Sequence, residues 1–420
     1  MSTRTARARR STPACWRSSN VRLSDVEHQE VAKSRLLRAL AGARVPHAYL
    51  FIGPEGVGKQ MMAMRFARLL LCPRALPAAH AAPDGGRETC GDCDDCRMLA
   101  GGVHPDYRVI SRASHRLHPD RAVQRRRPID ISIDVVREFV INQMSTRPAR
   151  GRAKIFVIDE AEMLTTQAEN SLLKTLEEPP AGSYLILVAT SDANLLPTIR
   201  SRCQVVPFGP LPTDYIVRRL SSTPDLSPSD ARYVAELSEG RLGPAQRLVL
   251  TKAPERRERV LHMLSAAIRN PLDLGKPFTA LTEEIIAIGE KLADARDAVV
   301  NRVDDDREEA EASEGGAAEF VPEPHALRKA RREVLAMMAA ALRDAMRLAC
   351  GARPLGHAEP PDIARAIADL ARTLGRDRAA RAIRAVAEAE AQIDLNANLS
   401  LVLDGLGIAL SRDHQGVEAA

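Results

Sequence analysis

The segment that most constrains the fold is a glycine-rich turn between a short apolar run and a helix. AYLFI (48–52) runs directly into GPEGVGK (53–59), and apolar residues at helical spacing follow, among them Met62 and Phe66. A strand, a turn of the form G-x-x-x-x-G-K and a helix together make a phosphate-binding loop, in which backbone N–H groups and the helix N-terminus surround phosphates. The alternative is a tight glycine turn without nucleotide.

Nucleotide contacts are expected from Gly53, Gly56, Gly58 and Lys59, the lysine adding a point charge. One position departs from the usual motif, because Gln60 stands where a Ser or Thr hydroxyl normally ligates Mg²⁺. An amide side chain is a longer and poorer magnesium ligand than a hydroxyl. We therefore expect nucleotide to bind without efficient hydrolysis.

Three further apolar runs have the length of strands: KIFVI (154–158), YLILVAT (184–190) and QVVPF (204–208). Continuous apolar strands separated by helices are typical of a parallel sheet that is covered on both faces. Residues 25–210 are therefore expected to form an α/β domain.

Polar residues follow two of these strands. Asp159 and Glu160 come directly after KIFVI, and Thr190 ends the next strand. Because ligands bind at the carboxyl ends of parallel strands, Asp159 is placed to hold Mg²⁺, Glu160 to orient an attacking water and Thr190 to sense the γ-phosphate. The alternative for the two acids is a solvated helix start.

A compact cysteine run calls for a separate explanation. Cys90, Cys93 and Cys96 have C-x-x-C-x-x-C spacing, and Cys72 precedes them at the end of the phosphate-loop helix. Four thiolates can surround Zn²⁺ tetrahedrally, so we expect a structural zinc module at about 72–96. An iron-sulfur cluster also takes four cysteines and stays the alternative. The other cysteines have no comparable neighbours: Cys15, Cys203 and Cys350.

Strand signals do not return after the third proline of the run at 207–212. A small helical segment is expected at 211–252 and an all-α domain at 253–420. Between Asp304 and Glu323 there are nine acids against one basic residue, which predicts a mobile acidic insertion at about 302–325. It is interpreted as a plain linker, with an acidic partner-binding element as the alternative.

The formal charge of +5 is concentrated at the start of the chain. Residues 1–24 hold six Arg and no acid, which leaves 54 of the 60 basic residues against 55 acidic ones in the remainder. The body supplies no general attraction to nucleic acid. The tail is expected to be disordered, with a basic arm that touches nucleic acid or a transit peptide as alternatives. No apolar stretch is long enough for a membrane span, so no membrane contact is predicted. The odd number of cysteines fits a reducing compartment, so a cytoplasmic location is predicted.

With these residues in view, the chain resembles the AAA+ subunits of the bacterial DNA polymerase III clamp loader. The resemblance covers roughly residues 25–250 and rests on the cysteine module and four segments: HAYLFIGPEGVGK (47–59), HPDY (104–107), KIFVIDEAEMLTTQAENSLLKTLEEPP (154–180) and IRSRC (199–203). It implies an AAA+ P-loop domain with an inserted Cys₄ zinc module, a helical lid and an all-α collar. The C-terminal helices match the collar only in their pattern.

Within that family, two departures favour the delta-prime type over the ATP-hydrolysing tau/gamma type. Gln60 replaces the hydroxyl residue, and Gly243 stands at the lid position where motors carry an arginine. Lys59 and the Asp159–Glu160 pair are retained, which keeps ATP–Mg binding open. Arg241 or Arg247 could also substitute for the missing lid arginine.

The resemblance implies a subunit of a hetero-pentamer that uses ATP to open a sliding clamp and place it on primed DNA during replication. Such a chain is a component of a DNA-directed DNA polymerase, a nucleotidyltransferase, but is not expected to polymerise DNA and is at most a weak ATPase. Arg202 of IRSRC would act as an arginine finger in a neighbour's ATP site. The alternative for Arg202 is a surface salt bridge.

Two rival functions stay open. The first is a tau/gamma-like motor or an independent AAA+ ATPase, and the second is a zinc-dependent nucleic-acid-binding module. The basic segment RPARGRAK (147–154) could face DNA through phosphate contacts or be a solvated loop before a strand.

Overall fold

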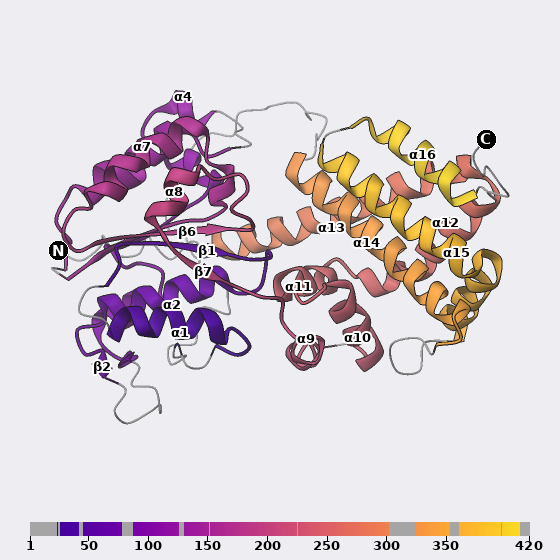
Figure 1. Cartoon of the computed structure of the whole chain (residues 1–420), viewed down its shortest axis with the longest axis horizontal. Coiled ribbons are helices and arrows are strands. Elements are labelled where there is room, and N and C mark those ends of the chain that lie inside the picture. The colour runs from indigo at the N-terminus through magenta and orange to yellow at the C-terminus, as the bar shows by residue number, and fades with distance from the viewer. Residues whose placement is uncertain are drawn as a thin grey trace. The chain divides into compact units, whose positions relative to one another are not determined.

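The computed structural model (Figure 1) describes residues 23, 26–41, 45–77, 87–125, 130–150, 152–224, 226–301, 324–352, 361–395 and 397–411. Residues 1–22 of the predicted tail and 302–323 of the predicted acidic insertion lie outside the described residues. The chain forms two compact units. The first runs to Pro212 and includes Arg241–Gly243, and the second holds Thr213–Gly240 and the chain from Pro244 onward.

A five-stranded sheet forms the centre of the first unit. Its strands are β1 (Ala48–Ile52), β4 (Tyr107–Ile110), β5 (Lys154–Ile158), β6 (Ser183–Ala189) and β7 (Gln204–Pro207), in the order β4-β5-β6-β1-β7. All neighbouring pairs are parallel. The predicted parallel α/β fold is therefore confirmed. The carboxyl ends of β1, β5 and β6 meet at one edge of the sheet, which brings the phosphate-binding loop, Asp159 and Thr190 to the same side.

Strand β4 is the strand of the five-stranded sheet that we did not predict. It lies at the edge of the sheet and pairs only with β5. Arg108 and Val109 are exposed, whereas Ile110 is buried. A strand of four residues with a charged side chain lacks the continuous apolar run by which the inner strands are detected.

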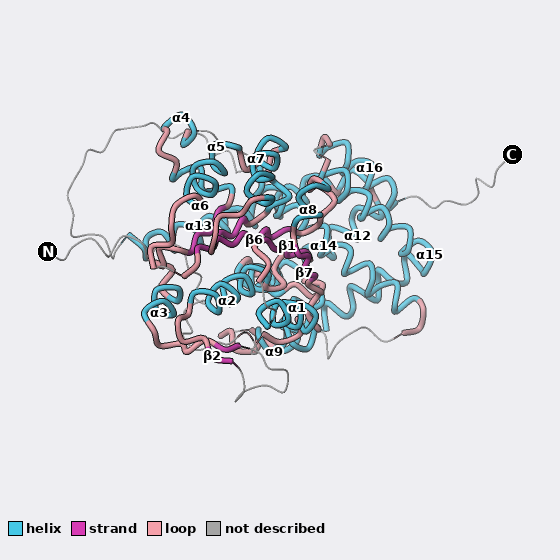
Figure 2. The backbone as a smooth tube through the Cα atoms, turned by 60° about the vertical axis from the view of Figure 1, so that its left-hand side comes forward, coloured by secondary structure: helices cyan, strands magenta, loops and turns pink. Residues whose placement is uncertain are grey.

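Helices cover both faces of this sheet (Figures 1 and 2). On one face lie α1 (Glu30–Ala41) and α2 (Lys59–Leu71); on the other lie α5 (Ile133–Val136), the π-helical turn η3 (Arg137–Ile141), α6 (Asn142–Met144), α7 (Thr166–Glu177) and α8 (Pro197–Arg202). Alternation along β1 divides its side chains between the two layers. Tyr49 and Phe51 pack with α1 and α2, and Leu50 packs on the opposite face with α7.

Short elements complete the first unit. They are β2 (Leu76–Pro77), β3 (Arg87–Glu88), α3 (Asp94–Ala100), the 3₁₀ helix η2 (Arg112–Leu117), α4 (Arg121–Gln124) and the 3₁₀ helix η4 (Ala161–Met163). Strands β2 and β3 pair antiparallel between Cys72 and Cys90.

The described residues of the second unit are helical, without a strand, as predicted. Its helices are α9 (Thr213–Leu220), α10 (Pro228–Leu237), α11 (Leu242–Leu250, whose first two residues belong to the first unit), α12 (Ala253–Arg269), η5 (Pro271–Asp273), α13 (Gly275–Asn301), α14 (Pro324–Ala349), α15 (Pro361–Asp394) and α16 (Leu399–Ser411). The predicted lid and collar share this unit, so the division between them at about residue 252 stays a prediction.

Two helix signals in this unit can be compared with the structure. Ser227 caps α10 with Pro228 at its first position, and the Ser227 hydroxyl accepts the N–H of Asp230 at 3.1 Å. Gly375 interrupts α15 with a φ of 62°, and the helix resumes directly after it.

A buried ion pair joins α12 and α14. The Arg256 guanidinium donates to the Glu333 carboxylate, which also accepts the Thr251 hydroxyl at 2.9 Å. Both charged side chains are almost wholly buried. This pairing satisfies charges that would otherwise be costly to bury. None of the helices among the described residues combines the length and the apolar character needed to cross a bilayer.

Candidate functional site

The glycines of the phosphate-binding loop are required by its backbone. Gly53, Gly56 and Gly58 have φ angles of 154°, 79° and 100°. A Cβ atom on Gly53 would lie 2.3 Å from the Phe208 carbonyl oxygen, so no larger residue fits there. The strand, turn and helix therefore have the local geometry that a phosphate-binding loop needs.

The side chain of Lys59 lies back across its own loop. Its Nζ donates to the carbonyl oxygens of Gly53 at 2.5 Å and Pro54 at 2.7 Å. Burial lowers the pKa of Lys59, although the nearby Glu162 and Asp159 carboxylates act in the opposite direction. The ammonium group therefore lies within the phosphate-binding loop, where it is expected to help bind phosphate.

Gln60 contacts the carboxylate that was predicted to hold magnesium. The Gln60 Nε2 donates to Oδ2 of Asp159, which joins the start of α2 to the end of β5. Burial, together with the neighbouring Glu160, raises the pKa of Asp159 to about 6. The amide thus occupies the Asp159 carboxylate directly. A Ser or Thr hydroxyl at position 60 has a shorter reach and would leave room for an ion.

Glu160 has an arginine partner that we did not predict. It adopts a φ of 54°, and both of its oxygens accept from Arg112, from Nε at 2.8 Å and from Nη2 at 2.6 Å. Arg112 begins η2, immediately beyond the end of β4. A bidentate guanidinium is a strong partner for a carboxylate and competes with any water that the carboxylate would orient. No sequence signal linked position 112 to position 160.

The predicted phosphate sensor is also paired with an acid. The Thr190 hydroxyl donates to Oε1 of Glu162 at 2.6 Å, and its backbone N–H donates to the same oxygen at 3.2 Å. Thr190 lies on the expected edge of the sheet, with its hydroxyl engaged by Glu162.

Gly243 packs directly on the phosphate-binding loop. Its N–H donates to the Gly56 carbonyl at 3.0 Å, and a Cβ atom on Gly243 would lie 3.0 Å from the Gly56 Cα. Position 243 therefore does lie beside the loop. A side chain of any size would have to push the two backbones apart.

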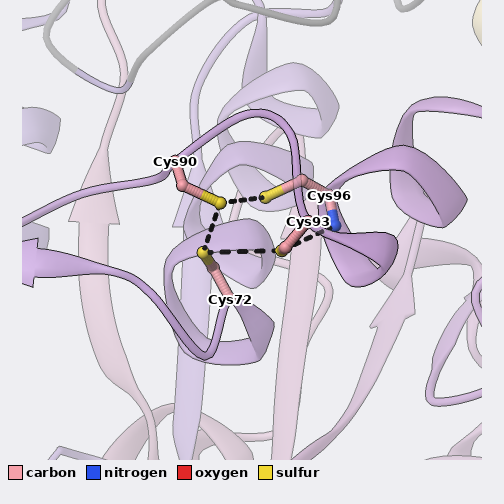
Figure 3. A group of neighbouring side chains, drawn as sticks. All are labelled: Cys72, Cys90, Cys93 and Cys96. Carbon is pink, nitrogen blue, oxygen red and sulfur yellow. Dashed lines mark hydrogen bonds between the residues drawn. The ribbon is translucent and has the colours of Figure 1, made fainter.

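The four cysteines of the predicted zinc module lie together (Figure 3), with all four Sγ atoms within 4.8 Å of one another. The Sγ of Cys72 lies 3.5 Å from that of Cys90 and 3.8 Å from that of Cys93, and the sulfurs of Cys90 and Cys96 are 4.0 Å apart. All four are free thiols. Tetrahedral zinc with Zn–S bonds of about 2.3 Å separates its sulfurs by about 3.8 Å, so the cluster fits one metal ion.

Local structure explains how these cysteines converge. Cys72 ends α2, and Cys93 caps α3, where its sulfur accepts the N–H of Cys96 at 3.4 Å. Cys72 and Cys96 are completely buried, and Cys93 nearly so. Of the three cysteines that were expected to have no comparable neighbours, Cys203 and Cys350 lie outside the cluster. Cys15 is outside the described residues.

Arg202, the predicted arginine finger, lies at the end of α8. Its Nη2 lies 2.5 Å from Oε1 of Glu177, and its Nη1 donates to the Thr198 carbonyl at 3.1 Å. The Arg202 side chain is 34% exposed. The neighbouring Arg200 pairs with Asp192 at 2.6 Å. Within one chain, Arg202 therefore makes a surface salt bridge, and its exposure leaves it within reach of a second protein.

Comparisons with known proteins found similarity to subunits of DNA polymerase III. A family model described as DNA polymerase III, delta subunit, matches residues 28–212. DNA polymerase III subunit delta' of Pseudomonas aeruginosa is 36% identical over 235 residues, which cover 55% of this chain and 64% of that protein. Subunit delta' of Escherichia coli is 30% identical over 56% of this chain and 64% of its own length. The match thus spans less than two thirds of either relative.

One further curated protein and one solved structure are also similar to this chain. DNA polymerase III subunit tau of Salmonella typhimurium is 36% identical over 188 residues, 45% of this chain and 25% of that protein. A gamma subunit-related protein of Thermotoga maritima covers 90% of this chain and 98% of its own, at 16% identity and a TM-score of 0.36.

The residues that the family model matches include the parallel sheet, the phosphate-binding loop and the cysteine cluster. Residues 28–212 of this chain are therefore similar to DNA polymerase III subunits, with delta' subunits among the relatives at 30–36% identity.

Proposed function

We propose that this chain is a clamp-loader subunit of the delta-prime type, which helps to place a sliding clamp on primed DNA. The observation that carries the proposal is the Gln60–Asp159 hydrogen bond in a chain that is similar to delta' subunits. It places an amide where a motor subunit would hold magnesium. Its partners would be the other subunits of a hetero-pentameric loader, the clamp and, through the complex, DNA.

Nucleotide binding by this chain would use the predicted loop. Its glycines, Gly53, Gly56 and Gly58, and Lys59 would surround phosphates, and Asp159 would hold Mg²⁺ if Gln60 moved away. Thr190 would approach the γ-phosphate only by releasing Glu162. Efficient hydrolysis is not expected, because Asp159 and Glu160 both have protein partners.

The cysteine cluster would hold structural zinc. Four thiolates saturate a tetrahedral ion and leave no open position for catalysis. A multi-iron cluster needs room for bridging sulfides between its ligands, and the close approach of the four sulfurs favours a single ion instead.

Replacing Gln60 with threonine is expected to raise the affinity for ATP–Mg about tenfold, equivalent to about 1.4 kcal/mol. The hydroxyl would free Asp159 and supply a magnesium ligand. Turnover is expected to rise further when Arg112→Ala is added, because that change releases Glu160. ATP binding and phosphate release by the purified chain measure both effects.

Gln167→Thr is the matched control, since Gln167 is exposed on α7. It should change neither quantity. A turnover by the unaltered chain on the order of one per second or faster would contradict the weak-ATPase prediction and favour a motor subunit.

Reconstitution tests the proposed function as a whole. The chain is to be combined with the other loader subunits, and clamp placement on primed DNA is to be measured with and without it. Loss of loading without this chain supports the proposal. Steady ATP turnover by the isolated chain would favour the independent ATPase. DNA binding that survives loss of assembly but vanishes on zinc removal would favour the nucleic-acid-binding module.

A further inference from the structure

A basic stretch of chain is joined to the cysteine cluster by side-chain contacts. The stretch comprises residues 147–150 and Arg152, and we call it the basic segment. Arg150 pairs through its Nε with the carboxylate of Asp95, a residue that is 7% exposed. Asp95 lies in the first turn of α3, between Cys93 and Cys96. An arginine far along the chain is thus held by the helical turn that carries two of the cysteines.

A buried aspartate holds the backbone of the same segment. The Asp106 carboxylate accepts the N–H of Ala149 at 2.7 Å and that of Arg150 at 2.9 Å, and the residue is 1% exposed. Two N–H groups bonded to one buried carboxylate fix the direction of the chain there.

His104 connects these two aspartates. Its Nδ1 accepts the N–H of Asp106 at 3.1 Å, which leaves the proton on Nε2, and Nε2 lies 3.2 Å from Oδ1 of Asp95. The His104 side chain is completely buried. The HPD part of the HPDY motif therefore forms a continuous set of hydrogen bonds from α3 to the basic segment.

Guanidinium groups also contact the cysteines themselves. Arg152 donates to the carbonyl oxygen of Cys72 at 3.0 Å, and the buried Arg68 donates to that of Cys96 at 3.2 Å. Four thiolates around a divalent ion carry a net charge of about −2. Two arginines that donate to the backbone of the cysteines place positive charge beside that centre.

We propose that the order of the basic segment depends on the metal: metal binding fixes α3 and Asp95, and these hold Arg150 and the adjoining backbone. The inference rests on the zinc centre of the proposed function. It gives Arg150 and Arg152 of RPARGRAK a role in the protein itself, in place of the DNA contact that the sequence left open. The segment leads into β5, so its contacts with α3 and Asp106 fix the start of the strand that ends at Asp159.

Hydrogen exchange on the full chain tests whether the order of the basic segment depends on the metal. Zinc-loaded protein and protein stripped by a chelator are compared by mass spectrometry, and the metal content of each sample is determined. The amides of Ala149 and Arg150 are expected to exchange at least about tenfold faster without metal, because they lose the fixed Asp106 carboxylate. Trypsin should also cut faster after Arg150 and Arg152.

Two neighbouring aspartates provide a matched pair of variants. Asp95→Asn is expected to keep about one metal ion yet speed tryptic cleavage after Arg150 and zinc transfer to a chelator. Asp94→Asn, on the same helical turn, should do neither, because Asp94 pairs with Arg97 on the exposed side of α3. Folding of both variants is checked by their circular dichroism.

The outcomes are distinct. If the loaded sample holds metal but the basic segment exchanges equally fast in both samples, the proposed dependence on metal is overturned and the zinc site stands. Equal behaviour of Asp95→Asn and Asp94→Asn also overturns that dependence. If protein purified under reducing conditions contains no metal, both the zinc site and the metal-dependent order of the basic segment are overturned. None of these results bears on clamp loading, which the reconstitution measures separately.

Discussion

Replacing Cys93 with serine is expected to reduce the metal content from about one ion per chain to near none. Cys93 supplies one of four ligands, and its sulfur also caps α3 by accepting the N–H of Cys96. A serine hydroxyl is a poor zinc ligand that stays protonated near neutral pH, whereas the coordinating thiol is a thiolate. Elemental analysis of reduced protein and the absorption of the cobalt-substituted form measure the loss.

The structural effect of Cys93→Ser should be local. Binding free energy at such sites is also folding free energy, so residues 87–100 and the basic segment that they hold are expected to lose protection from hydrogen exchange. The phosphate-binding loop should keep its protection, because α2 is anchored by Met62 and Phe66 in the core of the sheet.

Cys203→Ser provides the control for that experiment. Cys203 begins the chain into β7, outside the cluster, and burial raises the pKa of its thiol to about 12. The variant should retain its metal. Iron in the purified protein, or full zinc occupancy in Cys93→Ser, would contradict the four-cysteine zinc site.

The inner part of the fold could be predicted from sequence because its signals are local. KIFVI is apolar at every position after Lys154, and all five of its residues are buried in β5. Strand β4 escaped prediction because an edge strand needs only one apolar face and carries Arg108 outside. The way in which Gly375 interrupts α15 could not be predicted either, because glycine both ends and bends helices, and the packing of the following helix decides between them.

The candidate site was predictable in its members and not in their partners. Loop spacing and strand ends identified Lys59, Gln60 and Asp159. That Arg112 would hold Glu160 depends on β4 lying beside β5, a pairing that only the three-dimensional fold supplies. The same is true of Thr190 and Glu162, which are brought together by the turn after β5. These contacts are what separate a site that resembles an ATPase from one expected to hydrolyse ATP slowly.

Arg202→Ala is expected to lower ATP turnover and clamp loading by the assembled complex, with little effect on the folding of this chain. We propose that the Arg202 guanidinium neutralises charge on the phosphoryl group that is transferred in a neighbour's site. Arginines that act in this way are worth roughly 10³ or more in rate at the site they serve. Because only one of several sites is affected, the loss is best measured by single-turnover hydrolysis.

The salt bridge with Glu177 gives this experiment its decisive control. If Arg202 serves only to pair with Glu177, then Glu177→Gln removes the same interaction and should impair the complex to the same extent. Exposed pairs of this kind contribute about 0–1 kcal/mol, so neither change should then reduce the rate strongly. If Arg202 acts on the neighbour, Glu177→Gln leaves the guanidinium free to reach the phosphate and should preserve the rate. Arg200→Ala, which breaks the adjacent pair with Asp192, should also preserve it. A complex carrying Arg202→Ala that loads clamps at the unaltered rate would leave only the salt bridge as the role of this arginine.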